Sequence, residues 1–310
     1  MNTRSWPGNR RPGPARDPVT SERGRLINLT YRLLGSLAEA EDAVQETYAR
    51  WYAMSARQQE AVESPGAWLT KVAGRVCLNV LGSARVRRET YVGEWIPEPL
   101  PEPGEWLDGR PGGATADPAD RVTLDESVSM AFLVVLESMT PAERVAFVLH
   151  DVFRYSFAEV AEIVGRTPAA CRQLASSARR RVRASRPSPA PAPQQAAVVR
   201  DFRQAWEAGD VHALIGLLDP DAVVIADGGG RVVRRPRVEG AEQVARACVE
   251  LTGRAPGLTI LERTVNGRPG LVAQQDGATT AVLAFDVAGG RVRRIWAVFA
   301  PEKLRSWTRG

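Results

Sequence analysis

The apolar residues of the N-terminal third recur every three or four positions, which is the spacing typical of amphipathic helices. The repeating positions are Leu26, Leu29, Leu33 and Leu34; Val44, Tyr48 and Trp51; and Leu69, Val72, Val76 and Val80. Ser64-Pro65 adds a helix-start signal, because proline is tolerated at the first position of a helix. The segment 19–90 is therefore predicted to be all helical.

The segment 121–184 is also predicted to be helical, and capping signals mark where its helices begin. Two capping boxes are Thr140 with Glu143 and Ser156 with Glu159. Gly165 favours a left-handed helix stop, and Thr167-Pro168 favours a new helix directly after it. A short helix, a tight turn and a longer helix predict a helix-turn-helix over 157–184.

The segment 195–307 changes character, with helices expected near 195–208 and 211–218 and strands after them. Three dipeptides that favour tight hairpin turns separate the strand-like runs: Asn266-Gly267, Asp276-Gly277 and Gly289-Gly290. Apolar and polar residues alternate over 282–287 and 292–299, as in strands with one buried face. We expect an α+β domain with a curved antiparallel sheet.

Two proline-rich stretches separate these three segments. The first covers 91–120, and the second, 185–194, alternates proline with alanine or serine and is expected to form a semi-rigid spacer. Residues 1–18 are rich in arginine, proline and glycine and lack the apolar core of a signal peptide, so they are interpreted as a disordered tail.

Composition adds little beyond excluding some classes of function. The 310 residues carry a net charge of +5, a basic bias that is compatible with nucleic acid but does not establish it. Cys77, Cys171 and Cys248 are far apart and are interpreted as small buried apolar residues. With two histidines, the chain predicts no metal site and no cofactor. No apolar run has the length of a membrane span, and we expect a cytoplasmic protein.

The second helix of the predicted helix-turn-helix has one apolar face and one basic face. Cys171, Leu174 and Ala178 fall on the face expected to pack inward. The opposite face and its flanks carry Arg172, Gln173, Ser176, Arg179, Arg180 and Arg183. Gln and Arg can bond base edges and Arg can bond phosphates, so this face fits the major groove. A charged face exposed only to water is the alternative.

Two charged clusters lie in the first helical segment. The acidic cluster contains Glu39, Glu41, Asp42 and Glu46, which fits a basic surface on a protein partner, although a solvated helix face is equally compatible. The basic cluster contains Lys71, Arg75, Arg85, Arg87 and Arg88, which fits the backbone of a melted DNA strand. Trp68 is either a base-stacking residue or a core residue.

These motifs resemble those of extracytoplasmic-function sigma factors of RNA polymerase. Residues 39–52, EAEDAVQETYARWY, resemble the polymerase-binding helix, and 68–89, WLTKVAGRVCLNVLGSARVRRE, resemble the helix that opens and reads the −10 element. The helix-turn-helix is similar to the domain that reads the −35 element. The resemblance covers about 20–185, in the right order. It implies that RNA polymerase core and promoter DNA are the partners.

The resemblance also implies a role for individual residues. The polymerase-binding residues would be Glu41, Asp42, Gln45 and Glu46. The −10 contacts would be Trp68, Lys71, Arg75, Asn79, Arg85, Arg87 and Arg88. Family members often carry Asn at position 75, Asp at 79 and Arg at 82, so the −10 base preference does not carry over. A sigma factor performs no covalent chemistry, so no catalytic residue is expected.

The linker and the C-terminal segment resemble one subgroup of this family. Residues 91–100, YVGEWIPEPL, resemble the linker of sigma factors that carry a C-terminal SnoaL-like domain, a cone-shaped α+β fold. Asp227-Gly-Gly-Gly and Ala300-Pro-Glu-Lys-Leu match subgroup motifs, the second with two substitutions. The implied interdomain contacts are Tyr91, Trp95, Pro97, Leu100, Asp227, Gly228, Gly229, Gly230, Lys303 and Leu304. The fold class expected is thus multidomain: two all-α sigma domains and a SnoaL-like domain that regulates them from within.

Two other functions remain open from the sequence. A SnoaL-like domain can house an isomerase, for which Asp219, Asp221, Asp227 and His212 are the acid–base candidates, or it can bind a small molecule as a signal. A helix-turn-helix regulator fused to such a domain is the other alternative. A regulator of that kind would act as a dimer on operators, whereas a sigma factor is expected to be a monomer when it is not bound to polymerase.

Overall fold

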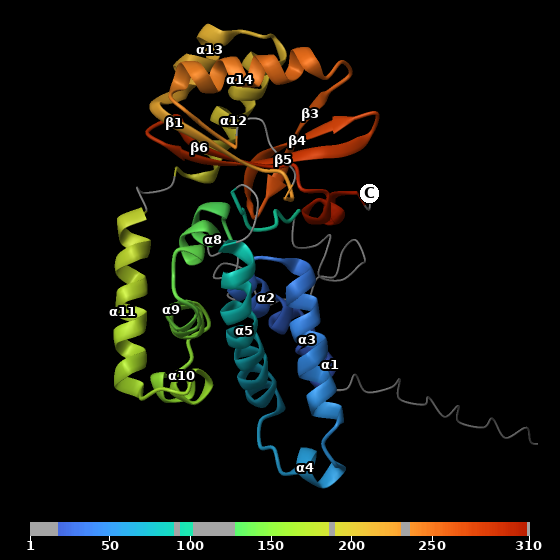
Figure 1. Ribbon diagram of the computed structural model, residues 1–310, viewed down its shortest axis with the longest axis vertical. Helices are drawn as coiled ribbons and strands as arrows, with labels where there is room; N and C mark the ends of the chain where they lie inside the picture. Colours follow the sequence, from blue (N-terminus) through green and yellow to red (C-terminus); the bar gives the residue numbers. More distant parts are fainter. Residues whose placement is uncertain (1–17, 90–93, 102–127, 186–189, 231–235, 309–310) are drawn as a thin grey trace, which may run out of the picture.

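The computed structural model describes residues 18–89, 94–101, 128–185, 190–230 and 236–308. Within them, an elongated helical part and a sheet domain are stacked end to end, and the segment 94–101 runs between the two (Figure 1). None of the helices in these ranges is long and apolar enough to cross a membrane.

The helical part has the two modules expected from the sequence. The first contains α1 (Pro18–Ser21), α2 (Arg23–Leu34), α3 (Leu37–Tyr52), α4 (Ala56–Glu60) and α5 (Pro65–Glu89). The second contains α8 (Met130–Glu137), α9 (Pro141–Phe147), η1 (Val148–Val152), α10 (Phe157–Val164) and α11 (Pro168–Ser185). Apolar residues of both modules form one continuous core, so the modules are packed against each other rather than separate.

The helix-start and helix-stop signals of the second module are confirmed. Thr140 and Ser156 each accept a hydrogen bond from the backbone N–H three residues later, and the glutamates at those positions bond back. Gly165 has a left-handed φ of 69° and ends α10, so the chain turns sharply into α11. The predicted helix-turn-helix is therefore α10, this turn and α11.

The C-terminal domain contains three helices and six strands. They are α12 (Ala192–Glu207), α13 (Val211–Leu217), β1 (Leu218–Asp227), β2 (Arg237–Glu239), α14 (Ala241–Arg254), β3 (Thr259–Val265), β4 (Arg268–Gln275), β5 (Ala278–Ala288) and β6 (Arg291–Val298). Two short 3-10 turns follow, η2 (Pro301–Lys303) and η3 (Arg305–Trp307). The three predicted hairpin dipeptides connect β3 to β6, and all six of their residues have positive φ, as in type I′ turns.

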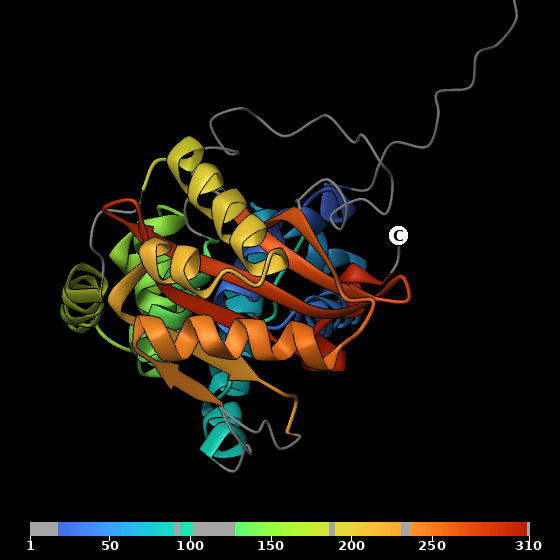
Figure 2. The same ribbon diagram turned by 90° about the horizontal axis from the view of Figure 1, so that it is seen from above.

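The sheet has two differently covered faces. Its strand order is β2-β1-β6-β5-β4-β3. Helices α12, α13 and α14 cover one face (Figure 2). Phe202 and Trp206 of α12 are buried in the core between these helices and the sheet. The other face packs on Ile96 of the linker and on Met130 of α8. The sheet is therefore the wall between a helical layer and the rest of the molecule.

Two expectations need correction. The sheet is mixed rather than antiparallel, because β1 and β6 pair in parallel after the long excursion through β2 to β5. Helix α12 begins at Ala192, inside the predicted spacer, because Pro193 stands at the helix start, where no N–H is needed. The acid–base candidates Asp219 and Asp221 lie within β1, where the ladder is interrupted and Asp221 N–H bonds the Asp219 carboxylate.

Candidate functional site

The segment 94–101 is held by an ion pair of the C-terminal domain. The Asp227 carboxylate lies 2.7 Å from Lys303 Nζ, and both side chains are buried. The same two groups bond the backbone of one linker residue, because Ile96 N–H donates to Asp227 Oδ2 at 2.9 Å and Lys303 Nζ donates to Ile96 O at 2.5 Å. We call this arrangement the linker clamp.

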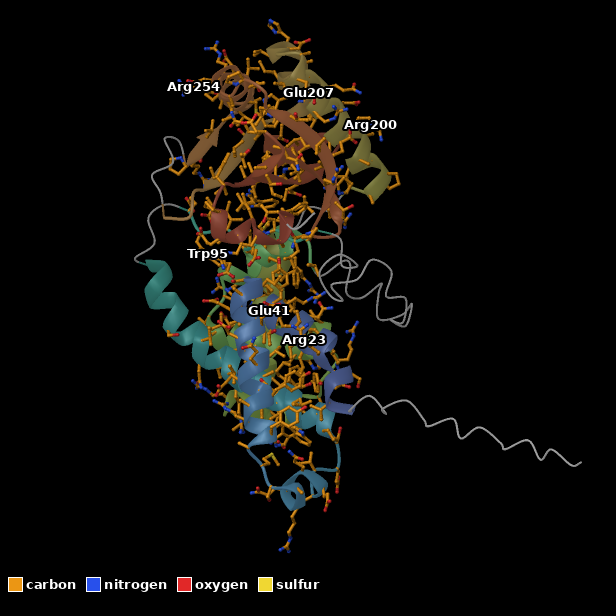
Figure 3. The ribbon with its side chains drawn as sticks, turned by 90° about the vertical axis from the view of Figure 1, so that its right-hand side faces the viewer. Arg23, Glu41, Trp95, Arg200, Glu207 and Arg254 are labelled. Carbon is orange, nitrogen blue, oxygen red and sulfur yellow. The ribbon has the colours of Figure 1, made fainter. Side chains whose placement is uncertain are left out.

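The neighbours of the clamp explain why these residue types are needed. Lys303 Nζ also lies 4.2 Å from the ring centroid of Trp95, a cation–π contact at the level where the two parts meet (Figure 3). Gly229 N–H donates to the other carboxylate oxygen of Asp227, and a Cβ at Gly229 would lie 2.6 Å from a Glu302 oxygen. The turn after β1 therefore favours glycine at this position, because its φ of 71° lies in the left-handed region.

A second set of bonds joins the linker to both parts at once. Asn266, in the β3–β4 turn, donates its backbone N–H to Leu100 O, and its side-chain oxygen accepts from Leu100 N–H. The Asn266 amide also donates to the hydroxyl of Tyr31 in α2, which in turn donates to Glu98 O at 2.6 Å. Trp307 Nε1 donates to Pro99 O at 2.8 Å. One buried network thus connects α2, the linker and the sheet domain.

Glu98 anchors the linker on the first helical module. Its carboxylate accepts a bond from Leu37 N–H at 2.7 Å, at the start of α3, and its backbone N–H donates to Gly35 O. The side chain is buried, and burial raises the pKa of this carboxyl to about 7, although the bonds from Leu37 and Ser36 and the charge of Lys303 act in the opposite direction.

The apolar linker residues enter two different cores. Ile96 packs on the sheet with Leu304, whereas Leu100 packs with the helices of the two N-terminal modules. Trp95 closely approaches Gly35, where a Cβ would lie 2.9 Å from its ring. Ile96 and Leu100 are therefore buried against their neighbours, and Pro97 is buried as well.

Most of the acidic cluster on α3 is exposed, although Glu39 is half-buried. Glu41, Asp42, Gln45 and Glu46 all lie on the outer face of α3, with Val44 buried behind them. Glu41 faces Arg23 at 3.8 Å (Figure 3), and Glu46 faces Arg50 at 3.1 Å. In both pairs the side chains are about half exposed. Such surface pairs contribute little energy, so this face is available to a partner.

Helix α11 presents most of its basic face to solvent. Arg172, Gln173, Ser176, Arg180 and Arg183 are exposed. Arg179 is partly covered and donates to Asp151 at 2.7 Å, which leaves it less available than the others. The inward face differs slightly from the expectation, because Cys171, Ala175 and Ala178 are the fully buried residues and Leu174 and Val182 are partly buried. The larger side chains of Leu174 and Val182 lie at the edges of this inward face because α9 packs closely on α11.

Two residues of the basic cluster on α5 contact α10. Lys71 forms an ion pair with Glu162, and Arg75 donates to Glu162 O at 2.8 Å. Between them Gly74 is so close to α10 that a Cβ would lie 2.8 Å from Ile163. These side chains are therefore turned toward the helix-turn-helix in this structure, whereas Asn79, one turn further along, is exposed.

The remaining sequence candidates fall into three groups. Trp68 is partly buried and meets Trp51 edge-on at 5.2 Å, which favours the interpretation of a core residue. The side chains of Arg85, Arg87 and Arg88, and all of Tyr91, lie outside the described residues. The proposed acid–base residues do not converge: His212 and Asp221 are exposed at separate places, and Asp227 is occupied by the clamp.

The residues that sequence reasoning missed are Tyr31, Glu98, Asn266 and Trp307. Asn266 was recognised only as a turn residue, and Glu98 was part of a motif without a role. Their contacts span 61 to 235 positions in sequence, so no local pattern indicates them. In the part of the chain that the structure describes, no group of His, Cys, Asp and Glu side chains could hold a metal ion.

Comparison with known proteins agrees with this geometry. Residues 19–88 match Sigma-70 region 2, and residues 129–182 match Sigma-70, region 4. The chain is 38% identical over 295 residues to the ECF RNA polymerase sigma factor SigJ of Mycobacterium tuberculosis, covering 91% of this chain and 90% of that one. The probable ECF RNA polymerase sigma factor SigI of the same organism is 34% identical, with 93% and 95% covered.

A crystal structure extends the likeness to the third domain. The structure of the Mycobacterium tuberculosis extracytoplasmic function sigma factor SigJ superposes with a TM-score of 0.71 at 36% identity, covering 92% of this chain and 96% of that one. The superposition includes the helical modules and the sheet domain, so the expected fold class of two helical modules followed by a SnoaL-like domain is confirmed.

The clamp can be tested by removing its cation. Replacing Lys303 with Met leaves the Asp227 carboxylate buried without its counter-ion, which typically costs about 3–5 kcal/mol. We expect faster hydrogen–deuterium exchange in the peptide that contains Ile96, and partial recovery in the double variant Lys303→Met/Asp227→Asn. Arg246→Met, on the exposed face of α14, is the control and should leave exchange unchanged; equal exchange in all variants would contradict the clamp.

The raised pKa of Glu98 predicts that linker docking depends on pH. Because its pKa is raised in the folded state, the folded protein binds the proton more tightly than the unfolded chain, and the associated stability is present at low pH. That stability is lost as the pH rises from the unfolded value, about 4.5, through about 7. We expect the exchange of the 94–101 peptide to accelerate over this window. Glu98→Gln should flatten the profile, and an identical profile in that variant would contradict the assignment.

Proposed function

Because this chain belongs to the extracytoplasmic-function sigma factors of RNA polymerase, which direct promoter-specific initiation of transcription, we propose how its surfaces divide that work. The exposed face of α3 with Glu41, Asp42, Gln45 and Glu46 binds a basic surface of core polymerase. The polymerase supplies the catalysis, and the sigma factor acts as a monomer alongside it in the cytoplasm.

The promoter contacts are assigned to two helices. The exposed face of α11, with Gln173, Ser176 and Arg180, reads the −35 element in the major groove, while the flanking Arg172, Arg179 and Arg183 hold phosphates. Helix α5 reads the −10 element, where Lys71, Arg75 and Asn79 bind the melted strand. The exposure of the α11 face and of Asn79 supports this assignment.

The described arrangement is a closed state that cannot bind both promoter elements. The centres of the two elements are about 25 base pairs apart, roughly 80 Å of B-form DNA at ~3.4 Å per base pair. In this structure α5 and α10 are in van der Waals contact, and Glu162 occupies Lys71 and Arg75. Promoter binding therefore requires the two modules to separate and these cations to exchange Glu162 for phosphates.

The C-terminal domain regulates this opening through the linker. Residues 94–101 connect the two modules in sequence, and the clamp holds their backbone against the sheet. While the linker is docked, Leu100 lies in the core that the two modules share, so docking and closure favour each other. The domain also binds a small molecule that adjusts the docked population. The occupation of Lys71 and Arg75 by α10 is the observation that carries the proposal.

The contact between α5 and α10 that holds the closed state can be loosened by a single charge reversal. Glu162→Lys places a cation beside Lys71 and Arg75 in place of the carboxylate that holds them. We expect several-fold more run-off transcript with core polymerase on a promoter library. Glu242→Lys makes the same change of charge on α14, far from the contact, and should match the unmodified chain. Lower output from Glu162→Lys than from this control would overturn the closed-state assignment.

The polymerase-binding face can be tested separately. The double variant Asp42→Arg/Glu46→Arg reverses the charge of an exposed surface, so folding should be unaffected while the affinity for core polymerase falls at least about tenfold. Fluorescence anisotropy of labelled protein titrated with core measures this loss. Glu207→Arg/Glu250→Arg, on the C-terminal domain, is the charge-matched control. Unchanged affinity in the α3 variant would contradict the assignment.

A further inference from the structure

The C-terminal domain contains a cavity of about 200 Å³ on the face of the sheet opposite the linker. Helix α14 forms one wall with Ala247 and Leu251, and strands β1 and β6 form the other with Ala226 and Ala297. Small side chains at three of these positions leave the space unfilled. Leu251 is 37% exposed and lies at the rim.

The chemistry of the walls restricts what can enter. Trp206 lines the cavity, and its only polar atom is already used, because Nε1 donates to Cys248 O at 2.7 Å. The charged lining residues are Glu250 and Arg254, and these form an ion pair with each other on α14. An ionised molecule would lose its hydration here without gaining a partner, so the walls favour an uncharged one.

We propose that this cavity binds a small, uncharged, apolar molecule and that its binding strengthens the linker clamp. Apolar cavities of about 150 Å³ are known to stay dry and to bind benzene, so a cavity of this volume accommodates a substituted single ring or a short hydrocarbon chain. This inference rests on the proposed regulatory role of the C-terminal domain and specifies the ligand class and the direction of its effect.

The cavity and the linker are separated by the thickness of the sheet. Successive residues of a strand point to opposite faces. In β1, Val224 and Ala226 line the cavity, while Asp227 holds Ile96 on the other face. In β6, Ile295 and Ala297 line the cavity, whereas Trp296 and Val298 belong to the apolar cluster that packs on Ile96. No intermediate layer separates the two sites.

At the ends of β1 and β6, a hydrogen bond connects the cavity directly to the linker clamp. Phe299 lines the cavity, and its backbone N–H donates to Asp227 O at 2.7 Å, so the residue that closes the cavity also positions the clamp carboxylate. A molecule packed against β1, β6 and Phe299 restricts their motion and therefore reduces the entropy lost when the linker docks. By linkage, docking must increase the affinity for the molecule by the same factor.

The experiment uses the full-length protein with fluorobenzene as the uncharged probe and benzoate as the charged one. Binding is followed by ¹⁹F NMR for fluorobenzene and by competition for benzoate, and linker docking by hydrogen–deuterium exchange of the 94–101 peptide. We expect saturable fluorobenzene binding, little benzoate competition, and about threefold slower exchange of the linker peptide at saturation. Lys303→Met, which loosens the clamp, should weaken fluorobenzene binding by the same factor.

Variants separate filling of the cavity from loss of the fold. Ala247→Phe fills the space from α14, and Leu251→Trp covers its rim; each should reduce probe affinity at least about tenfold while the melting temperature stays near that of the unmodified chain. Ala197→Phe, on the exposed face of α12, is the matched control and should bind normally. Unchanged binding in both cavity variants would overturn the site.

The remaining outcomes distinguish this inference from the function it rests on. Saturable binding with unchanged or faster linker exchange would overturn the coupling. Absence of fluorobenzene binding, with transcription still altered by Lys303→Met, would overturn the ligand site alone and leave the clamp intact. Binding without any transcriptional effect of Lys303→Met would instead remove the regulatory role.

Discussion

A linker that crosses the interior of a protein must find partners for its backbone, because buried N–H and C=O groups without hydrogen bonds cost too much free energy to be kept. Residues 94–101 form no helix or strand of their own. Asp227, Lys303 and Asn266 satisfy Ile96 and Leu100 from the sheet domain, while Tyr31 and Gly35 satisfy Glu98 from the first helical module. The compact arrangement of all three domains depends on these bonds.

The proposed function therefore gives the molecule two opposing states, one with the linker docked and one bound to the promoter. The surface that we propose for promoter melting and the surface that packs on the helix-turn-helix overlap at Lys71, Gly74 and Arg75. If these residues bind promoter DNA, both contacts cannot be made together, and a group that stabilises the docked linker would act against promoter binding without touching DNA. Burial raises the pKa of Glu98 to about 7, so the contribution of this side chain to linker docking is lost as the pH rises through that value.

The sheet domain suits this role because it presents two unlike faces. Helices cover one face and leave a small apolar cavity, and the linker covers the other. Because side chains alternate along β1 and β6, the cavity and the linker lie on opposite faces of the same two strands. In the proposed function, a molecule bound in the cavity would thus act on the linker through the sheet itself.

Local chemistry in the sequence determined much of the fold. The capping boxes at Thr140 and Ser156, the stop at Gly165 and the hairpin dipeptides such as Asn266-Gly267 act over three or four residues, so their elements could be predicted without knowledge of the rest. Only the tertiary structure decided which residues hold the linker and that Lys71 and Arg75 face α10. Asn266 and Tyr31 lie 235 positions apart and meet only because burial of apolar surface brings the sheet onto the helices, and no sequence pattern encodes the geometry of that meeting.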